Sequence, residues 1–350
     1  MSMKLRESLT DSSAMAQSNF GTASDSTVDL RDRFQGALVG IQLASIAPTR
    51  EQRPLQQAID YAMMQTSAFV SAPNNWSIDF TRLPSTAFLL PACVPMLLRY
   101  HHSWQKRLAM LTRLLDAPMM KTHESATRSM TRDAANKPKE SKADAELRRQ
   151  NIAQVLLLGD LLEAVNIGAI GIYHEPTSWL SWLTECTAAR YCEVPLVQAH
   201  YKAILAKIAE EIKLGPTNSY LVDSHSANSH LANSHLANSH SANSHGADSL
   251  LTKDDWSEGS ARCPWTTGAL TALAHPESYL LAMLSLTSTA TWSAVLVAGF
   301  LSGALCGKRA LPVLWQMHLS QSNFPVERGG DLASELFNLW AGQRLTVPLD

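Results

Sequence analysis

The sequence predicts an all-α fold, a compact multi-helix bundle with disordered insertions. Apolar residues recur at helical spacing along most of the 350 residues, and no segment shows the strict alternation of a strand. Small residues repeat every four positions in two segments, 33–47 and 294–307, as they do where helices pack closely. With 45% hydrophobic residues, the chain can bury one large core or two smaller ones.

Residues 1–28 form a polar leader that lacks the apolar core of a signal peptide, and we expect this leader to be disordered. A single all-α domain is expected over 29–350. Its first helix should cover 33–47, with Asp32 as the N-cap and Pro48 as the stop.

Small residues mark a seam on this first helix, at Gly36, Gly40 and Ala44. A similar seam lies near the other end of the chain, along 299–307. Because such seams let two backbones approach, we expect the two ends of the chain to meet in the core.

Further segments with helical periodicity follow the first helix. They cover 55–70, 88–100, 104–115, 152–172, 179–189, 195–214, 265–273, 278–286, 294–307, 311–318 and 332–340. Pro91 and Pro95 predict that the helix over 88–100 is kinked or begins late.

Two stretches interrupt these helices. The run 121–149 is charged and almost free of large apolar residues, which predicts a solvated linker. The stretch 216–262 contains a five-residue repeat, SH(S/L)AN, between Ser224 and Gly246. Its histidines could bind a metal, but a period of five spreads them around a helix and preorganises no site. We therefore expect a flexible surface loop.

The stretch 275–315 organises the chain. Two apolar arms, 278–286 and 294–307, flank an uncharged polar segment, 287–293, which we call the knuckle. Three interpretations are open: a transmembrane anchor over 278–307, a plain buried helix pair, or the inner helix of a domain with a functional knuckle. The polar knuckle and a mean hydropathy of −0.09 argue against a transmembrane span.

Charge and cysteine content exclude some classes of function. A net charge of −2 gives no electrostatic reason to expect nucleic acid or an anionic membrane as a partner. The five cysteines form no CxxC pair, which favours free thiols in a reducing cytoplasm over disulfides or zinc. The sequence names no ligand or partner.

One acidic pair stands out in the apolar segment 152–172. Asp160 and Glu163 lie three residues apart and would share a helix face. The pair is either a set of catalytic carboxylates or the polar stripe of a half-buried helix.

The two end segments of the chain resemble the ADP-ribosylglycohydrolases. The run 33–40, RFQGALVG, is similar to the family opening Arg-Phe-x-Gly-Ala-Leu-x-Gly. His275-Pro276, the run 299–307 (GFLSGALCG), and then Pro312 and Trp315 follow the family order near the C-terminus. The resemblance covers about a third of the chain and implies an ADP-ribosylglycohydrolase-like helical bundle.

The same resemblance implies a site with two magnesium ions held by carboxylates and threonine hydroxyls. The two aspartates of the family knuckle fall on Ala290 and Trp292, and their threonines fall on Thr291 and Ser293. A further family aspartate falls on Ser45. Alanine and indole offer no oxygen ligand, so we expect no magnesium cofactor, no metal ligand and no catalytic residue.

The expected protein is thus a pseudoenzyme, a binding or assembly module that keeps a relic pocket lined by Ser45, Thr291, Trp292 and Ser293. The alternative is a residual hydrolase of ADP-ribosyl or related glycosidic bonds. That enzyme would use other carboxylates, such as Asp79 or the Asp160–Glu163 pair.

Overall fold

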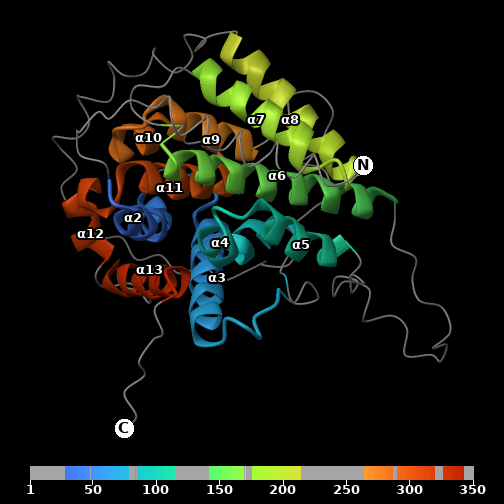
Figure 1. Ribbon diagram of the computed structural model, residues 1–350. Helices are drawn as coiled ribbons and strands as arrows, with labels where there is room; N and C mark the ends of the chain where they lie inside the picture. Colours follow the sequence, from blue (N-terminus) through green and yellow to red (C-terminus); the bar gives the residue numbers. More distant parts are fainter. Residues whose placement is uncertain are drawn as a thin grey trace, which may run out of the picture.

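A computed structural model describes ten stretches of the chain: 28–47, 49–78, 83, 85–115, 142–168, 170, 176–213, 264–286, 290–319 and 326–342. Every regular element within these stretches is a helix, which confirms the all-α prediction (Figure 1). The leader before residue 28, the histidine repeat and residues 121–141 of the predicted linker lie outside the described residues.

The fold is built around α11 (Trp292–Cys306), in which every residue after Trp292 is buried. Helices α2 (Leu30–Leu43) and α9 (Pro264–Ala274) pack along it, so segments from opposite ends of the chain lie together (Figure 1). An apolar helix enclosed by other helices needs no lipid to cover it. In the described part of the chain, no helix is long and apolar enough to cross a membrane.

Glycines bring α2 and α11 into backbone contact. A Cβ atom on Gly36 would overlap the carbonyl oxygen of Gly303, and a Cβ atom on Gly40 would overlap that of Gly299. These small-residue seams confirm that the two ends of the chain meet in the core. Gly307, with φ +73°, ends α11, and its amide bonds the carbonyl of Gly303.

The other helices surround this centre in two groups (Figure 1). One group contains η1 (Ala44–Ile46), α3 (Gln52–Ser71), η3 (Thr86–Phe88), α4 (Leu89–Arg99), α5 (Trp104–Leu115) and α13 (Val326–Trp340). The other contains α6 (Lys142–Asn166), α7 (Pro176–Arg190) and α8 (Pro195–Lys213). Outside both groups, α10 (Tyr279–Ser285) and η6 (Lys308–Ala310) pack on α11, and α12 (Val313–His318) follows η6.

Several predicted boundaries differ from those of the structure, for example the start at 332 of the last helix, which begins at Val326. Asp29, not Asp32, caps α2, because its side chain accepts the amide of Arg31. Residues 142–149 belong to α6 and are not linker: Glu146 and Arg149 pair along the helix at 3.2 Å, and Arg148 is buried. Helix α11 also begins inside the knuckle, at Trp292.

The four cysteines within the described residues are free thiols, in line with the prediction. Burial raises the pKa of the Cys186 thiol to about 12 and that of Cys306 to about 11. Both thiols are therefore held in the unreactive protonated form.

Candidate functional site

The knuckle residues form the N-terminus of α11. Thr291 is the N-cap, and its hydroxyl accepts the amide of Ala294 at 3.4 Å. The same hydroxyl lies 3.3 Å from that of Ser293, which is buried. Both hydroxyls that the resemblance assigns to metal binding are thus engaged in starting a helix.

An acid that the sequence analysis missed reaches this helix end. Glu51, just before α3, accepts the amide of Trp292 at 2.7 Å through its Oε2 atom. Thr49 supports the contact, because its hydroxyl donates to the carbonyl of Ala290 at 2.9 Å and accepts the amide of Glu51 at 3.2 Å. A carboxylate is stabilised here because a helix N-terminus carries unpaired amides and partial positive charge.

The indole of Trp292, within the knuckle, packs against aromatic residues of the core. It packs against Phe88 with ring centroids 5.3 Å apart, and Phe88 in turn meets Tyr61 edge-on at 5.9 Å. Trp292 and Ala290 are both half-buried against the core. The two positions assigned to family aspartates are therefore packed with apolar groups.

Ser45, the fourth expected pocket residue, lies on η1, which contacts α11. Its hydroxyl donates to the carbonyl of Gln42 at 2.8 Å, and its carbonyl accepts the side-chain amide of Gln52. The structure thus brings Thr291, Trp292 and Ser293 together, while the Ser45 hydroxyl is bonded to the preceding helix, α2.

Within the part of the chain that the structure describes, no group of three or more histidine, cysteine or acidic side chains could hold a metal ion. Asp79, named above as a possible carboxylate of a residual hydrolase, lies outside the described residues.

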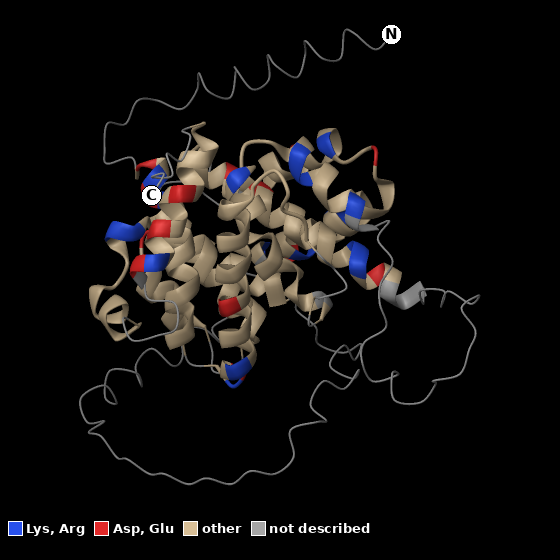
Figure 2. Cartoon of the chain, turned by 90° about the horizontal axis from the view of Figure 1, so that it is seen from below, with Lys and Arg blue, Asp and Glu red and all other residues tan. Residues whose placement is uncertain are grey.

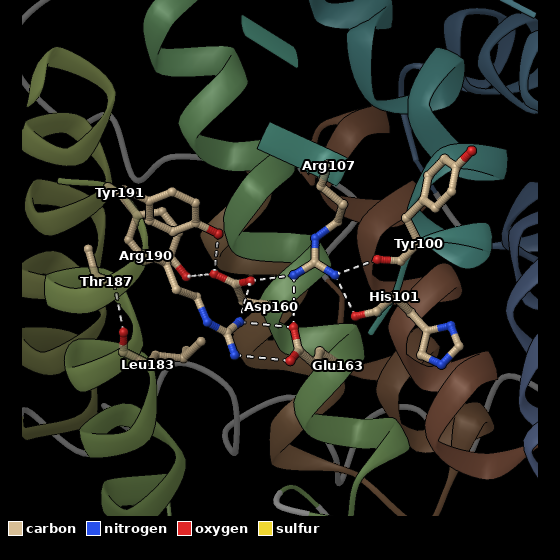
Figure 3. Close-up of polar contacts among 10 residues, drawn as sticks. Tyr100, His101, Arg107, Asp160, Glu163, Leu183, Thr187, Arg190 and Tyr191 are labelled. Atoms are coloured by element: carbon tan, nitrogen blue, oxygen red, sulfur yellow. Dashed lines mark hydrogen bonds and ion pairs between the residues drawn. The ribbon is translucent and has the colours of Figure 1, made fainter. Parts of the chain in front are cut away.

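The second candidate is the acidic pair on α6. Asp160 and Glu163 do share one face, but that face is covered by α5, α7 and α8 (Figure 3). Asp160 is fully buried, and its Oδ1 atom accepts Arg107 at 2.5 Å and Arg190 at 3.1 Å. Its Oδ2 atom accepts the hydroxyls of Tyr191 at 2.7 Å and Tyr201 at 2.8 Å.

Glu163 binds the same two arginines. Arg107 donates to its Oε2 at 2.9 Å, and Arg190 donates to Oε2 at 2.9 Å and to Oε1 at 3.0 Å (Figure 3). Arg107, itself fully buried, also donates to the backbone carbonyls of Tyr100 and His101. Two cations and two anions therefore form one neutral network, which we call the arginine–carboxylate network.

The network fixes the charge state of its members. Burial opposes the charge on Arg107, but Asp160 and Glu163 outweigh it and raise the pKa of the guanidinium. Burial, followed by the charge of Asp160, raises the pKa values of the Tyr191 and Tyr201 hydroxyls well above the usual range. Asp160 has no lone pair left for a substrate, so the pair acts as a structural core and not as an accessible acid–base pair.

Comparison of the chain with protein-family models, curated proteins and solved structures finds no match.

Proposed function

We propose that this chain is an ADP-ribosylglycohydrolase-like protein that has lost its metal centre and catalysis, and that it serves as a binding or assembly module. The observation that carries the proposal is the occupied N-terminus of α11. There the Trp292 ring packs against Phe88 in a tilted arrangement, and Glu51 accepts the Trp292 amide at 2.7 Å.

Magnesium chemistry accounts for the loss. Mg²⁺ takes oxygen ligands in near-octahedral geometry and is held by carboxylates. Ala290 has no ligand atom, and an indole N–H is a donor only. Among the described residues, the acid placed at the knuckle is Glu51, which is bonded to a helix amide and complements the positive end of α11 with its negative charge.

Retention of the close-packed helices supports an inherited scaffold. Gly36, Gly40, Gly299 and Gly303 still join α2 to α11, which carry the two segments of the resemblance. A residual hydrolase is disfavoured, because Asp160 and Glu163 are paired with two arginines and shielded from solvent.

Calorimetric titration with magnesium chloride and with ADP-ribose tests the proposal. We expect no magnesium-dependent binding of ADP-ribose and no release of ADP-ribose from a modified peptide. Magnesium-dependent ADP-ribose binding at micromolar affinity, or turnover, would overturn the loss of catalysis.

A gain-of-ligand variant tests the family placement separately. In Ser45→Asp/Ala290→Asp/Trp292→Asp, carboxylates return to the three positions where the family has them. If α2 and α11 retain the family geometry, millimolar magnesium should raise the melting temperature of this variant and leave the wild type unchanged. A folded variant that is indifferent to magnesium would argue against the family placement.

A further inference from the structure

Helices α10 and α12 lie at the same flank of the molecule (Figure 1). The two helices are joined where the rings of Tyr279 and Trp315 meet edge-on at 6.2 Å. Six large apolar residues are exposed on them, by 39% to 78%: Leu280, Leu281, Leu284, Val313, Leu314 and Met317. We call this surface the α10–α12 face.

Packing among the described residues does not cover these side chains. Helix α10 already buries Tyr279, Ala282 and Met283 against the core, so its outward leucines form a second apolar side. Helix α12 buries none of its residues and carries no lysine, arginine or acid. A surface helix is normally polar on its outer side, so both helices are apolar where water would favour polar groups.

The size of the face approaches that of a protein interface. Six side chains of this size, exposed to these fractions, present on the order of 600 Å², at the upper end for the largest apolar patch of a monomer. A specific interface buries about 800 Å² on each partner, including a polar rim. The six apolar residues alone therefore present about three-quarters of the area that each subunit of a stable dimer buries.

The charges around the face favour association with a second copy of the chain over adsorption to a lipid surface. Exposed Glu277 precedes α10 and exposed Arg309 precedes α12, so both signs occur at the rim. Figure 2 shows acidic and basic segments interspersed over the molecule, without one dominant sign. A net charge of −2 opposes self-association weakly and gives an anionic membrane nothing to attract.

We propose that the α10–α12 face is the interface through which two copies of this chain form a symmetric dimer. In a two-fold dimer the same face is used on both subunits, so one uncharged apolar surface covers another. The inference rests on the assembly role proposed above and names its partner. Its test measures molecular mass, so its failure leaves the magnesium and ADP-ribose titrations unaffected.

The experiment compares the full-length wild type with Leu281→Glu/Leu314→Glu by sedimentation velocity over micromolar concentrations. Leu281 is the third residue of α10, three after its cap Ser278, and Leu314 is the second residue of α12. Glutamate is favourable in the first turn of a helix, so these changes charge the face without disfavouring its helices. The matched control is Leu196→Glu: Leu196 is 56% exposed and is the second residue of α8. Helix α8 lies away from α10 and α12 in Figure 1.

We expect the wild type and Leu196→Glu to sediment at about twice the 38.3 kDa chain mass. The double variant should sediment as a monomer, with its dissociation constant raised by at least about a hundredfold, because two charges per subunit would be buried unpaired. Unchanged helical circular dichroism checks that each variant is folded.

Three results would overturn the proposal: a monomeric wild type, a dimer that survives both glutamates, or a dimer that Leu196→Glu dissociates equally. A monomeric wild type that floats with phosphatidylcholine–phosphatidylserine vesicles would assign the face to a lipid surface instead.

Discussion

Replacing Arg107 by methionine should show how much the arginine–carboxylate network contributes to stability. Methionine fills much of the same volume but removes the charge and the donors. Asp160 and Glu163 would then share one remaining cation, Arg190, in a site where Asp160 has no contact with water. The carbonyls of Tyr100 and His101 would each lose the bond from Arg107.

The expected cost is large because the loss leaves a buried negative charge uncompensated. Breaking a buried ion pair from one side costs about 3–5 kcal/mol of the free energy of unfolding. A domain has a total stability of about 5–15 kcal/mol, so Arg107→Met should leave the protein marginally folded. Adding Glu163→Gln restores neutrality, so the double variant should be more stable than the sum of the single effects by about 1–3 kcal/mol.

Urea unfolding followed by tryptophan fluorescence and circular dichroism measures these energies. Arg149→Met is the matched control, because Arg149 pairs with Glu146 at 3.2 Å on an exposed face of the same network helix, α6. It should cost no more than about 0.5 kcal/mol. A cost below about 1 kcal/mol in the free energy of unfolding for Arg107→Met, or strict additivity with Glu163→Gln, would refute the structural role given to the network.

Three further predictions concern single positions. Gly303→Ala should destabilise the protein by about 1–3 kcal/mol or more in the same urea assay, because its Cβ would meet the backbone of α2. Its control is Gly330→Ala, whose Cβ would meet the end of a flexible lysine side chain, so this change should be neutral or stabilise the protein by up to about 1 kcal/mol. Glu51→Ala should cost about 1 kcal/mol by uncapping the amide of Trp292, and Glu51→Gln, which keeps an acceptor oxygen but not the charge, should cost less. A Glu51→Gln variant as stable as the wild type would exclude the carboxylate charge as a factor. Burial lowers the pKa of His101 from 6.5 to about 4. Between these pH values the unfolded chain binds a proton at this residue and the folded chain does not, so about 3 kcal/mol of the free energy of unfolding should be lost as the pH falls from 6.5 to 4. In His101→Gln this loss should be absent, which is measured by comparing the free energy of unfolding of the variant and the wild type across this pH range.

Local pattern was sufficient for much of the fold. The amphipathic spacing of 104–115 gives the bounds of α5, Trp104–Leu115, as the structure has them. The small-residue spacing on α2 and α11 correctly places those helices in contact. Such features depend on residues three or four apart, which a single sequence displays directly.

The candidate sites depend on contacts that local pattern does not contain. Glu51 and Trp292 are 241 residues apart, and Arg107 and Asp160 are 53 apart. One signal was available: two acids within the apolar run 152–165 predict buried cations, because a buried carboxylate requires a partner. That signal indicates that arginines are needed but not which arginines, since the choice depends on how α5 and α7 pack on α6.

The two polar features of the structure point to the same kind of function. At the knuckle and in the arginine–carboxylate network, the acids are bonded to groups of the chain itself: Glu51 to a helix amide, and Asp160 to two arginines and two tyrosines. A hydrolase needs a carboxylate that can reach a substrate or a metal, and these carboxylates are occupied. Six of the nine large apolar residues exposed on the described surface lie on α10 and α12, and apolar area is removed from water by association. The occupied acids and the exposed leucines are therefore the observations that support the assembly role proposed above.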